Sequence, residues 1–130
     1  MKKNRLLIID DDTDFLESLK VRLEKKNFLV HTASSGQEGL KTIEAINPDL
    51  ILMDIIMETD LEGYEMLETL RNRESMAEIP VILHSGMLEV VNSDLRAAVE
   101  EIESYHNVAF VDKSDDLEEL IFRIDCFLGQ

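Results

Sequence analysis

Cysteine, tryptophan and proline are scarce in this chain, whose 130 residues include one cysteine, no tryptophan and two prolines. The single cysteine, Cys126, excludes an internal disulfide and fits a reducing compartment. No apolar run approaches the roughly 20 residues that a membrane-spanning helix needs. The apolar stretch near the N-terminus lasts four residues before a run of aspartates, which argues against a signal peptide. These absences predict a cytoplasmic protein without a membrane segment.

Basic residues are also few, since 13 Lys and Arg stand against 28 Asp and Glu, and the formal net charge is −15 at pH 7. Nucleic-acid affinity depends on Lys and Arg side chains that neutralise phosphates. The charge therefore argues against nucleic-acid binding by this domain and favours proteins, metal ions or small phosphorylated molecules as partners. A length of 130 residues is typical of one domain, so residues 1–130 are predicted to form a single domain.

Five short apolar runs alternate with helical stretches along the chain, which is typical of a parallel sheet with crossover helices. The predicted strands are residues 6–9, 28–31, 50–53, 81–84 and 108–111. The predicted helices cover about residues 13–26, 35–46, 63–73, 88–104 and 117–128. The pattern indicates an α/β fold with helices packed on a five-stranded parallel sheet.

Aspartates follow two of the predicted strands: Asp10, Asp11 and Asp12 follow the first strand and Asp54 follows the third. Open α/β sheets bind ligands at the carboxyl ends of their strands. Carboxylates gathered there repel one another unless a cation lies between them, and oxygen ligands favour Mg²⁺. Asp12 is better interpreted as the N-cap of the helix that follows. The three histidines lack the spacing of metal ligands and are predicted to be packing or surface residues: His31, His84 and His106.

Two further polar residues end other strands, because Ser85 follows residues 81–84 and Lys113 comes soon after residues 108–111. Right-handed crossovers bring every carboxyl end to the same side of the sheet, so these groups are expected to converge with the aspartates. Two carboxylates would hold Mg²⁺ and a third would attack a phosphoryl group. The ammonium group would balance the phosphoryl charge, and the hydroxyl would hydrogen-bond the resulting acyl phosphate.

This order of residues resembles the receiver domain of two-component response regulators, from about Arg5 to Leu128. An acid pair, a single aspartate, a Ser or Thr and a Lys follow the first, third, fourth and fifth strands of that family. The resemblance implies a doubly wound, flavodoxin-like sheet with strand order 2-1-3-4-5. It also implies that Asp10, Asp11 and Asp54 bind the metal and that Asp54 is the phosphoacceptor.

The resemblance assigns roles to four more residues. Ser85 and Phe110 would be the switch hydroxyl and the switch aromatic, and Lys113 would contact the phosphoryl group. The backbone carbonyl of Ile56 would be the remaining protein ligand of Mg²⁺, with Mn²⁺ as a substitute. Two residues after Ile56 the chain has Glu58, and directly after Lys113 it has Ser114. The family usually has proline at both places.

The implied reaction is transfer of a phosphoryl group from the phosphohistidine of a histidine kinase or a histidine phosphotransfer protein to Asp54. Phosphorylation would change the face formed by the fourth helical region, the fifth strand and the last helix. It would also allow two copies of the phosphorylated domain to form a homodimer. No turnover of a separate substrate is expected. The expected activities are self-phosphorylation from phosphodonors and slow autodephosphorylation.

Two alternatives belong to other functional classes. A phosphatase of the haloacid dehalogenase type would also use a first-strand aspartate, a serine, a lysine and an acid pair such as Asp115 and Asp116. Its usual Asp-x-Asp-x-Thr/Val start fails because Asp14 stands in the last position, and Asp54 would lack a role. The other alternative is a receiver-like binding module that signals without phosphorylation, and the complete set of acids, serine and lysine argues against it.

Overall fold

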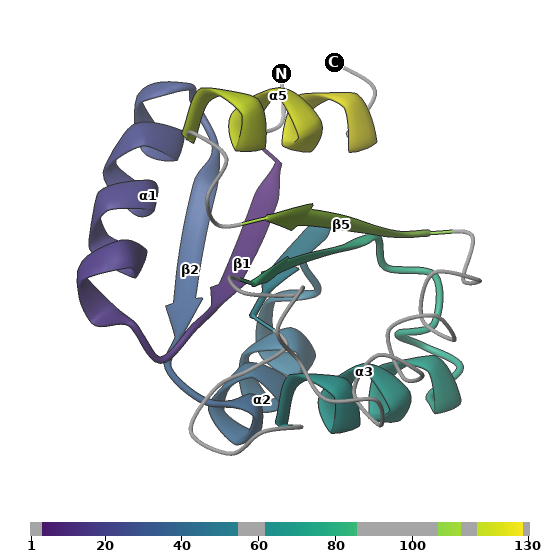
Figure 1. Ribbon diagram of the computed structural model, residues 1–130. Helices are drawn as coiled ribbons and strands as arrows, with labels where there is room; N and C mark the ends of the chain where they lie inside the picture. The colour runs from purple at the N-terminus through teal and green to yellow at the C-terminus, as the bar shows by residue number, and fades with distance from the viewer. Residues whose placement is uncertain (1–3, 55–61, 86–106, 113–116, 129–130) are drawn as a thin grey trace.

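The computed structural model describes residues 4–54, 62–85, 107–112 and 117–128 (Figure 1). In chain order the elements are β1 (Arg5–Ile9), α1 (Thr13–Lys25), β2 (Leu29–Ala33), α2 (Gly36–Ile46), β3 (Leu50–Met53), α3 (Glu62–Asn72), β4 (Val81–Ser85), β5 (Val108–Asp112) and α5 (Leu117–Phe127). The predicted helix at residues 88–104 lies outside the described residues. The described helices are 11 to 13 residues long, and none has both the length and the apolar character needed to cross a membrane.

The five strands form one parallel sheet in the order β2-β1-β3-β4-β5, which confirms the predicted order. Figure 1 shows α1 and α5 on one face of this sheet and α2 and α3 on the other. Because all pairs are parallel, the carboxyl ends of the strands lie along one edge. This edge is where the predicted site residues must meet.

Alternating side chains of the strands build a hydrophobic core on each face of the sheet. Leu7 and Ile9 of β1 pack with α2 and α3, whereas Leu6 and Ile8 pack with α1 and α5. The central strands β1 and β3 are buried on both faces, so they appear in the sequence as unbroken aliphatic runs. This double burial fixes the positions of the two strands that carry the aspartates.

The predicted second strand, residues 28–31, was displaced from the observed β2 (Leu29–Ala33). Phe28 is buried but precedes the strand, because Asn27 has a φ of 74° and the N–H of Phe28 donates to the carbonyl of Leu23. The apolar character of Phe28 therefore reflects packing against α1 and not membership of the strand. As an edge strand, β2 also alternates exposed and buried residues, which weakens its sequence signal.

Candidate functional site

The structure brings together three of the predicted site residues at the carboxyl ends of β1 and β3. The N–H of Asp54 donates to the carbonyl of Ile9 at 3.0 Å, and the N–H of Asp10 donates to the carbonyl of Ala33 at 3.1 Å. These bonds continue the sheet pairing one residue past each strand and hold the two aspartates side by side. Ligand oxygens of Asp10, Asp11 and Asp54 all lie within 4.8 Å of one another.

The three carboxylates differ in their exposure to solvent. Asp10 is 2% exposed and Asp54 is 6% exposed, whereas Asp11 is an exposed residue. One oxygen of Asp10 accepts a hydrogen bond from the N–H of Asp12 at 2.9 Å. Burial of two carboxylates beside a third is unfavourable because their charges repel and are poorly solvated. A cation at this position would offset that cost.

The donor set of this cluster fits a hard divalent cation. In the described part of the chain its members are all carboxylates, which Mg²⁺ prefers and Mn²⁺ also accepts. Mg²⁺ usually keeps several water ligands and takes only one or two protein carboxylates. The exposed side chain of Asp11 leaves a solvent side on which such waters could remain.

Of the other predicted site residues, the structure describes the backbone of two and leaves two outside its described ranges. Ser85 ends β4, and its backbone pairs with Asp112 of β5 at the same edge of the sheet as the carboxylates. Phe110 lies in β5, where it pairs with Leu83 of β4. Lys113 and Ile56 lie outside the described residues, so their roles stay predictions from the sequence.

A family model described as the response regulator receiver domain matches residues 6–125 of the chain. The chain belongs to the response regulator receiver domain family. The cell cycle response regulator CtrA of Brucella abortus (strain 2308) is 36% identical over 83 residues, which cover 64% of this chain and 34% of that protein. The chain thus matches only about a third of the length of such curated relatives.

Solved structures agree with the fold of this receiver domain. A CheY-like receiver domain protein from Methanospirillum hungatei JF-1 is 29% identical, with a TM-score of 0.80 and coverage of 98% of this chain and 95% of that chain. The chemotaxis response regulator CheY4 of Vibrio cholerae has the same TM-score of 0.80 at 18% identity, covering 97% and 99% of the two chains. At that identity the second comparison shows the fold alone.

Asp12 is the N-cap of α1, as its sequence position predicted. Its side-chain oxygen accepts a hydrogen bond from the N–H of Phe15 at 3.1 Å, and its backbone is extended. Its side chain is exposed and does not belong to the carboxylate cluster. Two residues of the aspartate triplet therefore belong to the candidate site of this receiver domain, and the third begins the helix.

Replacement of Asp12 by alanine is expected to lower the free energy of unfolding by about 1 kcal/mol, because an N–H of the first helical turn loses its acceptor. Asp12→Ser removes the same charge but keeps an oxygen that can cap the helix. Urea titrations should therefore give a lower midpoint for Asp12→Ala than for Asp12→Ser, with similar slopes. Equal midpoints for the two variants would show that Asp12 does not stabilise α1 by capping.

One residue that sequence reasoning did not assign to the site is His84. It is 3% exposed and lies next to Ser85 in β4. Its ring packs against Phe15, with ring centroids 5.1 Å apart and an angle of 40° between the planes. The sequence predicted a packing or surface residue, and the burial and the ring contact agree with the packing alternative. The sequence also offered one overlooked signal, because this histidine immediately precedes the last residue of a buried strand.

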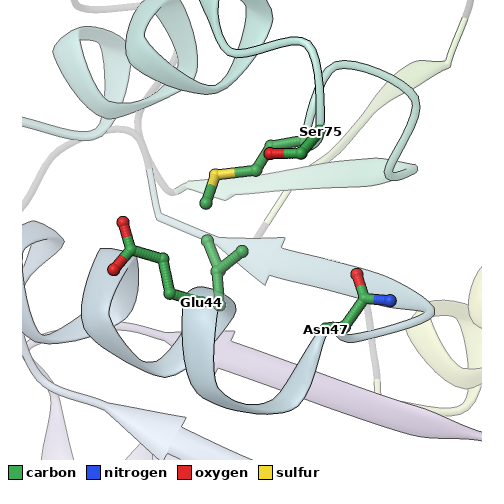
Figure 2. A pocket seen from close by; sticks show the side chains of 5 residues that line it. Glu44, Asn47 and Ser75 are labelled. Carbon is green, nitrogen blue, oxygen red and sulfur yellow. The ribbon is translucent and has the colours of Figure 1, made fainter.

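A cavity of about 350 Å³ lies at the other edge of the sheet, between the end of α2 and the segment that precedes β4. Figure 2 shows Glu44, Asn47 and Ser75 around it, and Ile43 and Met76 complete the lining. Beside it, Arg73 forms an ion pair with Glu44 at 2.7 Å. Because α2 leads into the amino end of β3, this cavity is separate from the carboxylate cluster.

Proposed function

We propose that this receiver domain is a phosphorylation-dependent signalling switch whose phosphoacceptor is Asp54. The observation that carries the proposal is the cluster of three carboxylates within 4.8 Å at the carboxyl ends of β1 and β3. Two of them are buried, although such burial costs stability. A binding module that signals without phosphorylation would not need this unfavourable arrangement.

In the proposed reaction an oxygen of Asp54 attacks the phosphorus atom of a phosphohistidine. The new O–P bond forms as the P–N bond breaks, and the imidazole of the donor leaves with the electron pair and takes up a proton. Bound Mg²⁺, held by Asp10, Asp11 and the carbonyl of Ile56, would neutralise charge on the phosphoryl oxygens. Lys113 would contact the same oxygens.

Positioning of the acceptor supports this role. The N–H of Asp54 is held by the carbonyl of Ile9, and its side chain is almost fully buried beside Asp10. A fixed nucleophile loses little freedom as the reaction proceeds, and electrostatic interactions are stronger in such a site than in water. The partly open side at Asp11 would admit the donor.

The signal would leave the site through Ser85 and β5. A hydrogen bond from the Ser85 hydroxyl to the acyl phosphate would pull on the end of β4, which is paired with β5 along its length. Phe110 in β5 would respond, and the face formed by residues 88–104, β5 and α5 would change. The net charge of −15 argues against a nucleic-acid partner. The proposed partners are proteins, namely a histidine kinase or phosphotransfer protein and a second copy of the phosphorylated domain.

Intact-mass measurements test the proposal with acetyl phosphate as a small donor. In millimolar Mg²⁺ we expect one phosphoryl group per chain, and we expect none after the metal is removed with EDTA. A folded wild-type protein that gains no phosphoryl group in Mg²⁺ would contradict the proposal. So would a gain that EDTA leaves unchanged.

The acyl phosphate is expected to persist because of two apolar residues. In this family the residues two past the phosphoacceptor and two past the switch hydroxyl border the path of the hydrolytic water, and here they are Ile56 and Met87. Both lie outside the described residues, and neither side chain can orient a water molecule by a hydrogen bond.

The double variant Ile56→Asn/Met87→Glu is expected to release phosphate about tenfold faster than wild type, because its polar groups can position water. The release of inorganic phosphate after donor removal measures this rate. Leu29→Asn, which makes an exposed apolar residue of β2 polar, is the matched control. Release at the wild-type rate from the double variant would show that these two positions do not set the lifetime.

A further inference from the structure

Two of the three carboxylates, Asp10 and Asp54, belong to a row of side chains that crosses the sheet at its carboxyl edge. The row below it is aliphatic and faces α1 and α5: Ile8, Leu52 and Ile82 are in register on β1, β3 and β4. Side chains on one face of a strand recur every second residue. Two positions further along these strands come Asp10, Asp54 and His84, which therefore lie on the same face in the next row.

This register places His84 beside Asp54, on the side opposite Asp10. Met53 pairs with Leu83, so the residues that follow them, Asp54 and His84, are level with each other. Neighbouring strands are about 4.8 Å apart, which brings an imidazole within reach of the carboxylate. The row thus has two acceptor groups, Asp10 and Asp54, followed by His84, whose ring can donate a hydrogen bond.

The imidazole is buried at this place and packs against an aromatic ring. It is 3% exposed, and one side of the ring contacts Phe15. Phe15 belongs to the first turn of α1, where its N–H is bound by the cap residue Asp12. The turn that follows the acid pair therefore also supplies the ring that packs against His84.

The imidazole is not part of the cation-binding set. Among the described residues, Asp10, Asp11 and Asp54 have ligand atoms that all lie within 4.8 Å of one another. His84 does not belong to this group, although a histidine nitrogen can also bind a metal ion. A ring that is buried next to the acceptor without joining this group is suited to orient the carboxylate.

We infer that His84 is a positioning residue for Asp54. In the complex with Mg²⁺ and the phosphodonor, a ring N–H of His84 would donate to one carboxylate oxygen and leave the other directed at the incoming phosphorus, since catalytic hydrogen bonds often tighten only when the reacting complex forms. The inference deepens the proposed function and rests on it. A rigidly oriented nucleophile raises the rate of the chemical step more than it changes donor or metal binding.

Three substitutions separate orientation from packing. His84→Phe keeps a ring against Phe15 and removes both nitrogens, whereas His84→Asn and His84→Gln place an amide N–H near one ring nitrogen or the other. His31→Phe is the control, because His31 is exposed on β2. Each protein is assayed for its phosphorylation rate at saturating acetyl phosphate, for the half-saturating donor concentration, and for Mg²⁺ affinity by calorimetry without donor.

We expect His84→Phe to lower the saturated rate about tenfold, with donor half-saturation and Mg²⁺ affinity close to wild type. One of the two amide variants should recover most of the rate, and His31→Phe should match wild type. A wild-type rate in His84→Phe overturns the inference. Equally slow phosphorylation in all three His84 variants also overturns it, since packing alone would then explain the loss.

A second measurement does not depend on phosphorylation. Long-range ¹H–¹⁵N spectra of the unphosphorylated protein should show His84 as one fixed tautomer whose ring nitrogens shift in Asp54→Asn, while those of His31 do not. Unchanged His84 nitrogens in that variant overturn the inference. If wild type takes up no phosphate although the shift is present, the proposed function fails and the contact between His84 and Asp54 stands.

Discussion

Replacement of Asp54 by asparagine is expected to lower the rate of phosphate uptake from acetyl phosphate by about a thousandfold or more, as removal of a nucleophile does in other enzymes. The amide has almost the same shape as the carboxylate, but it lacks the anionic oxygen that attacks phosphorus. The measurement is the fraction of phosphorylated chain by intact mass over time in saturating Mg²⁺.

Asp14→Asn is the matched control for that experiment. Asp14 is an exposed carboxylate in the first turn of α1, only a few residues from the acid pair, and its loss should leave the rate at the wild-type value. If Asp54→Asn still gained phosphate at the wild-type rate, another residue would be the acceptor.

The second large effect is expected in stability. Without a cation the carboxylates of Asp10, Asp11 and Asp54 repel one another, so part of the folding free energy is lost at this cluster. A ligand that binds only the folded state adds about 2.7 kcal/mol at 100 times its dissociation constant. Millimolar Mg²⁺ should therefore raise the melting temperature of wild type.

A variant of the exposed residue Asp11 tests whether the rise in melting temperature comes from this cluster. Asp11→Asn removes one charged ligand and one repulsive charge, so it should lose most of the Mg²⁺-dependent rise while its metal-free melting temperature stays equal or increases. Asp14→Asn should keep the full rise. Thermal unfolding with and without Mg²⁺ measures both quantities, and an equal rise in Asp11→Asn and wild type would remove Asp11 from the metal site.

The sequence predicted the parts of the fold that depend on local pattern. The range of β3 was correct because a central strand, buried on both faces, forms a continuous aliphatic run. The proximity of Asp10 and Asp54 was also predictable, since both follow parallel strands whose carboxyl ends share an edge. The boundary of β2 was wrong because Phe28 is buried by packing outside the strand.

Features that depend on distant pairing were not predictable. Asp10 is buried and its neighbour Asp11 is exposed, because the backbone of Asp10 still pairs with β2 before α1 begins. The place of His84 in the row of Asp54 depends on the register between β3 and β4, which no local pattern of residues specifies. The roles of Lys113 and Ile56 stay predictions from the sequence.

The central claim is tested most directly by locating the phosphoryl group on the chain. Phosphoramidate is a suitable donor, since its P–N bond resembles that of phosphohistidine. After reaction in Mg²⁺, borohydride reduces an aspartyl phosphate to homoserine, which peptide mass spectrometry can locate. The account predicts homoserine at position 54 alone, and homoserine at position 10 or 11, or unreduced aspartate throughout the chain, would contradict it.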